Sequence, residues 1–411
     1  MNVYKEINKC RICNSDQLEE ILKLGNQYLT GVFPKDVNLE ITNGPLTLIR
    51  CTSCGLVQLK HSYSLDEMYG DNYGYRSGLN NSMVKHLQNK IEFLEKTFTP
   101  SSSDLVIDIG SNDATSLKAY KGDFIKVGID PTGKKFINYY TNNINLIPDF
   151  FTFENFSQHY NGKRAKIITS ISMFYDLENP NTFVSDIQKT LDTDGVWHFE
   201  QSYMPAMLRT VSYDTICHEH LEFYSFSVIV ELLKKHKLKV IDVQTNAING
   251  GSFAVTATHE NSTLKPNMPI ISWMLQQENR MKLHTAGPYM EFEKNVLQHK
   301  EDLISLVKNL VADGKKIFGY GASTKGNVLL QYCNFTTSEI SCIADVNPDK
   351  HGSYTPGTNI PIVSEITARE MKPDYFLVLP WHFKYSILDR EKEFIQNGGK
   401  FIFPLPVIEI I

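Results

Sequence analysis

The sequence contains no apolar run that is long enough to cross a membrane. A transmembrane helix needs about 18 to 20 consecutive apolar residues, and the apolar stretch at 401–411 is short and interrupted by prolines. The first residues, MNVYKEINKCRICN, lack the apolar core of a secretion signal. We therefore expect a soluble, cytoplasmic protein without a membrane partner.

The sequence also lacks an excess of positive charge. Its 411 residues include 41 Lys and Arg against 46 Asp and Glu, a formal net charge of −5. A protein that binds nucleic acid along its phosphates normally carries a basic excess, so we expect no nucleic-acid partner. The length predicts two or three domains at about 150 residues each. Nothing in the sequence resembles a coiled coil, and the oligomeric state stays open.

Cysteine is infrequent, and seven residues do not make the even set of a disulfide framework. Four of the cysteines form two CxxC pairs, Cys10 with Cys13 and Cys51 with Cys54. Two such turns supply the four thiolates of a tetrahedral zinc site. We expect a structural Zn²⁺ on these cysteines, because four protein ligands leave no open position. Four unrelated cysteines, or a redox pair, are the alternatives.

Beyond residue 100, short apolar runs alternate with segments that suit helices. The runs are at 105–110, 124–130, 165–174 and 195–201, and the pattern resumes at 315–323, 340–348 and 375–381. Such alternation is typical of α/β folds with parallel sheets. We therefore expect an α/β protein with a small zinc-binding domain (1–78), a central Rossmann-like domain (79–284) and a C-terminal Rossmann-like domain (285–411).

The first of these strands ends in a turn that suits a nucleoside cofactor. A glycine there lets the backbone approach a ligand, and Asp130 ends the next strand, where its carboxylate can accept hydrogen bonds from ribose hydroxyls. A dinucleotide turn would read GxGxxG, whereas this turn has a single glycine, which favours S-adenosylmethionine over NAD. An ordinary β–α turn is the alternative. The predicted cofactor-binding residues are Asp108, Gly110, Ser111, Asn112, Asp130, Pro131 and Ser172.

A second glycine-containing turn, GYGASTKG at 319–326, follows a strand of the C-terminal unit. Thr324 stands where the third glycine of a dinucleotide turn would fall, and Asp345 follows the next strand. This turn either binds the pyrophosphate of a substrate or is a vestigial nucleotide-binding turn. If it binds NAD, the protein would be a sugar-nucleotide oxidoreductase or epimerase.

Residues 214–224, DTICHEHLEFY, are the densest run of acid–base side chains in the chain. Histidine titrates nearest to neutral pH, and a neighbouring carboxylate can orient it and raise its basicity. In an extended segment His218 and His220 would share one face, with Glu219 opposite. The alternative is a polar loop whose histidines pair with buried backbone groups.

Together these motifs resemble the C-3-methyltransferases that act on nucleotide-linked 4-keto-6-deoxyhexoses and make branched deoxysugars. The resemblance covers essentially the whole chain. It rests on the paired CxxC motifs, YRSG (75–78), DIGSNDAT (108–115), DTICHEHLEFYS (214–225), INGGSF (248–253) and GYGASTKGN (319–327). It implies an S-adenosylmethionine-dependent methyltransferase with a zinc-binding domain, a catalytic histidine and glutamate at His220 and Glu219, and a catalytic tyrosine at Tyr75.

For such an enzyme we predict that His220 removes the C-3 proton beside the 4-keto group. Glu219 would polarise His220 or hold the sugar, and the enolate oxygen would be steadied by Tyr75, His218 or Tyr224.

Two positions depart from a branch of this family. Cys217 stands where that branch has a tyrosine, and Asp176 where it has a histidine. The resemblance therefore does not fix the nucleotide, the sugar, the methylated carbon or its stereochemistry. A zinc-bearing scaffold with an inactive methyltransferase domain is the non-enzymatic alternative, and the intact Asp108, Gly110 and Asp130 argue against it.

Overall fold

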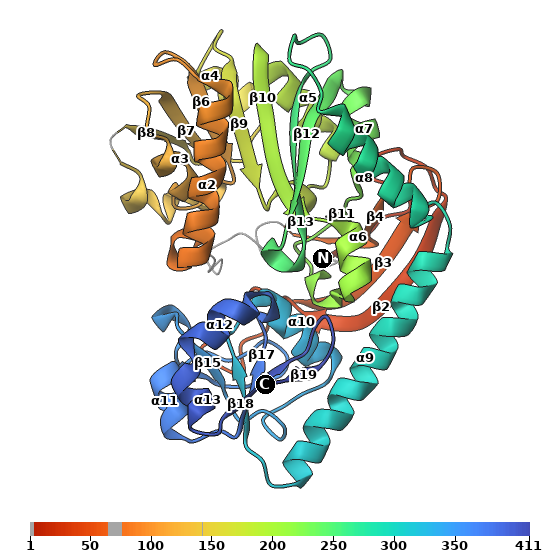
Figure 1. Cartoon of the computed structure of the whole chain (residues 1–411), viewed down its shortest axis with the longest axis vertical. Helices are drawn as coiled ribbons and strands as arrows, with labels where there is room; N and C mark the ends of the chain where they lie inside the picture. Colours follow the sequence, from red (N-terminus) through yellow and green to blue (C-terminus); the bar gives the residue numbers. More distant parts are fainter. Residues whose placement is uncertain (1–3, 65–75, 142) are drawn as a thin grey trace.

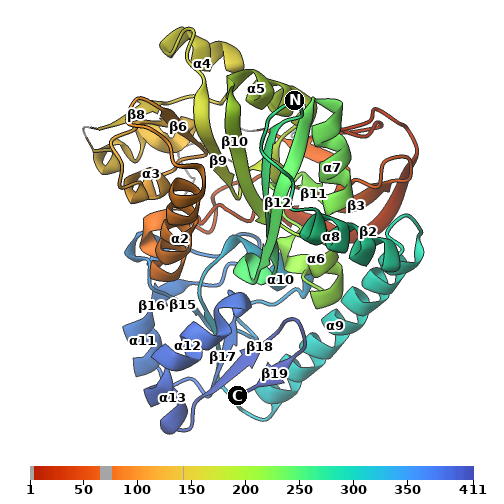
Figure 2. The ribbon, with the colours of Figure 1, turned by 45° about the horizontal axis from the view of Figure 1, so that its top comes forward.

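The computed structural model describes residues 4–64, 76–141 and 143–411. They form an α/β protein in which three larger sheets pack around one junction (Figures 1 and 2). Among the described residues, no helix combines the length and the apolar character that crossing a membrane would require.

The N-terminal region is built around a four-stranded antiparallel sheet. Its strands follow the order β11-β4-β3-β2, with β2 at Leu18–Tyr28, β3 at Asn43–Cys51, β4 at Val57–Leu59 and β11 at Glu222–Phe223. A separate pair joins β1 (Tyr4–Glu6) to β5 (His61–Tyr63). Strand β11 lies just after His218, Glu219 and His220, which we call the HEH run. It pairs with β4, with Glu222 opposite Gln58. The predicted catalytic run is therefore tied to the N-terminal sheet.

The central sheet has seven strands in the order β12-β13-β10-β9-β6-β7-β8. Strands β6 to β10 are parallel and β13 is antiparallel to its two neighbours. The strands are β6 (Leu105–Ile109), β7 (Ile125–Ile129), β8 (Ile144–Ile147), β9 (Ala165–Ile171), β10 (Leu191–Ser202), β12 (Leu238–Asn246) and β13 (Ser252–His259).

Helices flank this sheet, and the chain order reverses between β6 and β9. At such a switch point the turns after adjacent strands diverge and open a crevice for a ligand. The helices of this region are α2 (Asn81–Phe98), α3 (Thr115–Ala119), α4 (Phe153–His159), α5 (Pro180–Thr190), α6 (Met204–Thr210), α7 (Phe226–Lys235) and α8 (Met268–Arg280).

The long helix α9 (Gly287–Ala312) runs from the central to the C-terminal region along one side of the molecule (Figure 1). The C-terminal sheet has the order β16-β15-β14-β17-β18-β19 and is parallel except for β19. Its strands are β14 (Ile317–Tyr320), β15 (Ile343–Asp345), β16 (Ile362–Ser364), β17 (Tyr375–Val378), β18 (Lys400–Phe403) and β19 (Glu409–Ile410). Its helices are α10 (Thr324–Tyr332), α11 (Glu365–Glu370), α12 (Lys384–Arg390) and α13 (Lys392–Gln396).

One buried apolar cluster joins the three regions. It includes Leu46 of β3, Cys217 just before the HEH run, Phe292 of α9 and Phe318 of β14. Burying such side chains contributes roughly 1.5–3 kcal/mol each, so the junction is a packed interface. The predicted α/β architecture, with its N-terminal zinc-binding region and two Rossmann-like units, is confirmed.

Candidate active site and metal site

The four predicted zinc ligands lie together. Their Sγ atoms are all within 4.8 Å of one another, with Cys10 Sγ 3.6 Å from Cys54 Sγ and Cys13 Sγ 3.5 Å from Cys51 Sγ. With Zn–S bonds of about 2.3 Å, the edges of a ZnS₄ tetrahedron are about 3.8 Å. The donor set therefore fits a four-coordinate zinc ion, whose chemistry would be structural because no ligand position stays open.

The zinc-binding loop is fastened to the rest of the protein by a buried arginine. Arg11, between the first two cysteines, donates from Nη1 to the Leu59 carbonyl at 2.6 Å and from Nη2 to Ser62 Oγ at 2.8 Å. Its Nε lies 3.6 Å from Glu222 Oε1 in β11. Arg11 thus connects the zinc-binding loop to β11, the strand that follows the HEH run.

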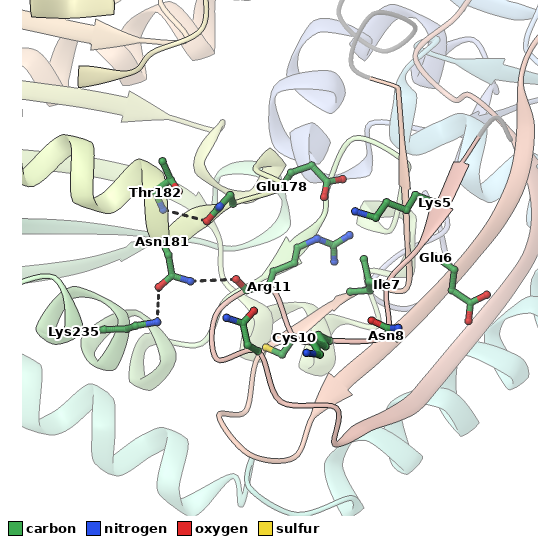
Figure 3. A pocket seen from close by; sticks show the side chains of 13 residues that line it. Lys5, Glu6, Ile7, Asn8, Cys10, Arg11, Glu178, Asn181, Thr182 and Lys235 are labelled. Atoms are coloured by element: carbon green, nitrogen blue, oxygen red, sulfur yellow. Dashed lines mark hydrogen bonds between the residues drawn. The ribbon is translucent and has the colours of Figure 1, made fainter. Parts of the chain in front are cut away.

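A pocket of about 460 Å³ opens beside the zinc-binding loop, between residues 5–14 and 178–182 (Figure 3). At its side Asn181 Nδ2 donates to the Ile12 carbonyl at 2.9 Å, and Lys235 Nζ donates to Asn181 Oδ1 at 2.8 Å. The HEH run does not line this pocket, so we do not place the reaction there.

The structure brings the predicted cofactor residues to the carboxyl ends of three adjacent strands. Gly110 follows β6 with a φ of +72°, and an added Cβ there would lie 3.1 Å from the Met173 side chain. Asp130 follows β7, and its two oxygens accept hydrogen bonds at 2.7 Å from Asn112 N and from Thr132 N. Thr132 Oγ1 also donates to Asp130 Oδ1 at 2.7 Å. A carboxylate has about four acceptor sites, so about one site of Asp130 is left for a ribose hydroxyl.

The other predicted cofactor residues surround these two. Asp108 is buried, accepts from Thr169 Oγ1 at 2.6 Å, and burial raises its pKa to about 7. Ser111 Oγ lies 2.8 Å from the Tyr140 hydroxyl, and Pro131 begins the short 3₁₀ helix after Asp130. Ser172 follows β9 with a φ of +56°. This set fits an adenosine-bearing cofactor such as S-adenosylmethionine at the switch point of the sheet.

Residues 76–78 cover the cofactor turn. Ser77 N donates to Asn112 Oδ1 and Gly78 N to Asp113 Oδ2, each at 3.0 Å. Arg76 Nε lies 3.8 Å from Asp113 Oδ2. The YRSG motif thus adjoins the cofactor turn, although the predicted catalytic Tyr75 lies outside the described residues.

His220 is held as a neutral base. Its Nδ1 lies 2.8 Å from the Thr215 carbonyl, so Nδ1 carries the hydrogen and Nε2 keeps its lone pair. The ring packs edge-on against Tyr175 at a centroid distance of 4.4 Å. Burial, and then the positive charge of Lys325, lower the pKa of His220 to about 4. The imidazole is therefore uncharged at neutral pH.

Glu219 lies beside His220 and has the opposite shift. Burial raises its pKa to about 7, and a hydrogen bond with the Cys217 thiol partly opposes this. A Cβ added to Gly31 of the N-terminal region would lie 2.4 Å from Glu219 Oε1 and 3.9 Å from Thr324 Oγ1. Glu219 therefore sits where all three regions meet.

A single short segment links the HEH run to the cofactor turn. Met173 is the side chain that an added Cβ on Gly110 would meet, and two residues later the Tyr175 carbonyl accepts from Leu221 N at 2.8 Å. The cofactor turn and the residue after His220 therefore both contact the segment 173–175.

Two predicted catalytic side chains are buried elsewhere. His218 is 0% exposed and its ring packs edge-on against Tyr63 at 4.6 Å. Tyr224 is also 0% exposed and stacks on Phe174 at 5.2 Å. In a straight extended segment His218 and His220 would share one face, but a turn at 218–219 breaks this pattern and gives the two rings different surroundings. The side chains of His218 and Tyr224 thus make packing contacts with aromatic rings, and their role in the reaction stays a prediction.

Two groups of polar residues near the site lie outside the predicted catalytic and cofactor-binding residues. Glu200, at the end of β10, is 1% exposed and lies 2.5 Å from His86 Nε2 and 2.6 Å from Lys90 Nζ. Burial alone would raise its pKa, but the His86 hydrogen bond and the Lys90 charge outweigh it and lower the pKa to about 2. His86 and Lys90 are four residues apart on α2 and share a face. This spacing was the signal in the sequence that could have indicated two side chains acting together.

The second group comes from the C-terminal region. Trp381 Nε1 donates to Asp214 Oδ2 at 2.7 Å, and Lys325 Nζ donates to the Asn249 carbonyl at 2.9 Å. These contacts connect α10 and the short 3₁₀ helix at Trp381–Phe383, which follows β17, to the loops around the HEH run. No local pattern in the sequence signals them, because the partners are far apart along the chain.

Comparisons with known proteins agree with this geometry. Residues 10–69 match a family described as a zinc binding domain, and residues 247–406 match the "C-methyltransferase C-terminal domain" family. The chain is 30% identical to the C-methyltransferase NovU of Streptomyces niveus, over 100% of this chain and 98% of that protein.

Among solved structures, two methyltransferases overlap part of the chain. An S-adenosylmethionine-dependent methyltransferase from Clostridium acetobutylicum is 12% identical, with a TM-score of 0.36, over 43% of this chain and 92% of its own. The plantazolicin methyltransferase BpumL is 13% identical, with a TM-score of 0.36, over 45% and 88%. It is the full-length similarity to NovU, with the two family matches, that shows the chain to belong to the S-adenosylmethionine-dependent C-methyltransferases.

Proposed function

We propose that this C-methyltransferase methylates a carbon, C-3 in our prediction, of a nucleotide-linked 4-keto-6-deoxy sugar through an enolate. The observation that carries the proposal is the neutral imidazole of His220, fixed through Nδ1 on the Thr215 carbonyl, next to Glu219 and one short segment from the cofactor turn. The sugar substrate itself rests on the motif resemblance described above.

Methylation of a sugar carbon needs a base because a C–H bond is not nucleophilic. A neighbouring ketone makes the proton acidic, since the negative charge that develops on carbon spreads onto the carbonyl oxygen. His220 Nε2 would take that proton. Positioned proton transfer of this kind contributes about 10²–10⁴ in rate.

S-adenosylmethionine, held by Gly110, Asp130 and the turns around them, supplies the electrophilic methyl group. Glu219, when ionised, would stabilise the imidazolium that forms on His220. Tyr75 stays a candidate for steadying the enolate oxygen.

The test combines labelled S-adenosylmethionine with a panel of nucleotide-linked 4-keto-6-deoxyhexoses, and follows deuterium exchange at C-3 in parallel. We expect label in a sugar carbon and loss of the C-3 proton. The His220→Asn enzyme should bind S-adenosylmethionine normally and lose at least 100-fold in both signals. Full turnover by that variant, or transfer to oxygen or nitrogen in the wild type, would refute the proposal.

A further inference from the structure

The nucleotide-type turn of the C-terminal region is occupied by its own side chains. Asp345 accepts from Ala322 N at 2.6 Å and from Asn347 N at 2.7 Å. On the other side Lys350 Nζ donates to the Ala322 carbonyl at 2.7 Å. An added Cβ at Gly321 would lie 2.7 Å from Pro380. The polar groups of this turn are thus paired within the region, and the turn is rigid.

Lys325 lies in the first turn of α10, directly after this turn, and contacts the central region. Its Nζ donates to the Asn249 carbonyl at 2.9 Å, which lies in the loop between β12 and β13 of the central region. The neighbouring Trp381 side chain donates to Asp214, four residues before His218. Two independent hydrogen bonds therefore fix the C-terminal region against the loops that border the HEH run.

Lys325 is also close to the acid–base pair. Thr324, its neighbour in sequence, and Glu219 both lie within 4 Å of the position that a Cβ on Gly31 would occupy, at 3.9 Å (Oγ1) and 2.4 Å (Oε1). Burial is the main cause that lowers the pKa of His220, and the Lys325 charge is the second. The same two causes lower the pKa of His382. Asp214 in turn opposes the lowering that burial imposes on the Lys325 pKa. An ammonium group thus stands within electrostatic reach of the base.

We propose that Lys325 is a catalytic residue, whose ammonium group binds the keto oxygen of the substrate and stabilises the negative charge of the enolate. The inference rests on the proposed function. An ammonium has three N–H donors, and the Asn249 carbonyl uses one, so two are left for the substrate oxygen.

The electrons balance as follows. His220 Nε2 takes the proton from the carbon beside the ketone, the C–H pair forms a C=C bond, and the carbonyl π pair moves to the oxygen opposite Lys325. When the carbon forms its bond to the methyl group, the oxygen pair returns to re-form C=O, and S-adenosylhomocysteine leaves.

The experiment separates proton removal from methyl transfer. Solvent deuterium exchange at C-3 is measured without S-adenosylmethionine, and labelled methyl transfer with it, for the wild type and for K325Q, K325M and K325R. K325Q keeps a donor for the Asn249 carbonyl without the charge, K325M keeps neither, and K325R keeps both. We expect K325Q and K325M to lose about 10²–10³ in both rates with unchanged affinity for S-adenosylmethionine, and K325R to stay within about tenfold of the wild type.

The pH profile gives a readout that a purely structural role would not move. Besides Lys325, the ionisable side chains next to His220 are Tyr175, whose ring packs against it, and Glu219, its neighbour in sequence, and both are the same in every variant. Removing the Lys325 charge raises the pKa of His220. Below the Glu219 limb near pH 7 the exchange rate should fall a second time as His220 is protonated, and this lower acid limb should move to higher pH in K325Q and K325M, and not in K325R.

Lys350→Met is the matched control, because this buried lysine supports the same turn through Ala322 and covers Phe33 at 4.6 Å. It should lower stability without moving the acid limb. A folded K325Q or K325M that exchanges the C-3 proton at the wild-type rate would overturn the inference, whether or not that variant has lost methyl transfer. A wild type with neither exchange nor transfer would instead refute the proposed function, and so the two failures are distinguishable.

Discussion

Gly250 should be intolerant of even one added methyl group. It has a φ of +87°, and an added Cβ would lie 2.8 Å from Trp381 Cη2, well inside the 3.4–4 Å of ordinary contact. Alanine in the left-handed region costs about 1–2 kcal/mol, and overpacking a rigid site about 1–3 kcal/mol. Gly250→Ala should therefore lower the free energy of unfolding by about 2–5 kcal/mol.

Gly314 provides the comparison. Its φ is +75° but an added Cβ meets nothing within 4 Å, so Gly314→Ala should show the backbone cost alone, about 1–2 kcal/mol. The difference between the two variants measures the contact with Trp381. Replacing Trp381 with Phe removes the atoms that the methyl group would meet, so part of the Gly250→Ala cost should vanish in the double variant.

Urea unfolding of the zinc-loaded protein, for the wild type, the three single variants and the Gly250→Ala/Trp381→Phe double variant, gives the coupling free energy. The reasoning would be refuted if Gly250→Ala and Gly314→Ala had equal costs. It would also be refuted if Trp381→Phe and Gly250→Ala were additive, since the two residues would then not be in contact.

Three further predictions concern the site. Asp130→Asn should weaken S-adenosylmethionine binding about 10- to 100-fold by calorimetry, because hydrogen bonds to a charged group contribute about 1.5–3 kcal/mol; unchanged affinity would remove Asp130 from the cofactor site. Because the pKa of Glu219 is raised to about 7, its ionised form prevails only above pH 7, and kcat/KM should rise through that pH. Glu219→Gln should abolish this rise. If the rise persists in the variant, another group is responsible for it. Replacement of zinc by Co²⁺ should leave kcat within about twofold, because a four-cysteine site has no open position; a large change in kcat would indicate that the metal contacts substrate.

Much of the architecture could be predicted because buried parallel strands give a direct signal. Strands covered on both faces read as short apolar runs, and the runs at 105–110 and 165–174 contain β6 and β9. Helix α2, Asn81–Phe98, likewise has a helical period in its sequence, with Met83, Leu87, Ile91 and Leu94 buried on one face. Strands β12 and β13 were not predicted, because their alternating sequences also suit surface segments.

The predicted cofactor residues lie close together for a topological reason. Residues that follow parallel strands lie at one edge of the sheet whatever the details of packing, so Gly110, Asp130 and Ser172 gather there. Side-chain burial in an irregular segment has no such rule. Whether His218 or His220 faces the site depends on the turn between them and on Tyr63, a contact 155 residues away in sequence. Lys325 could not be predicted because its neighbours come from another region.

Strand β11 has a consequence for how the chain is made. The N-terminal sheet forms β2, β3 and β4 from its first 59 residues, but the strand that covers the outer edge of β4 is at Glu222–Phe223. At a synthesis rate of about 5–20 residues per second, that edge stays uncovered for roughly ten to thirty seconds on the ribosome. An unpaired edge is a site of aggregation. During that interval a zinc ion bound by the four cysteines, all within the first 54 residues, would hold the two ends of this sheet together.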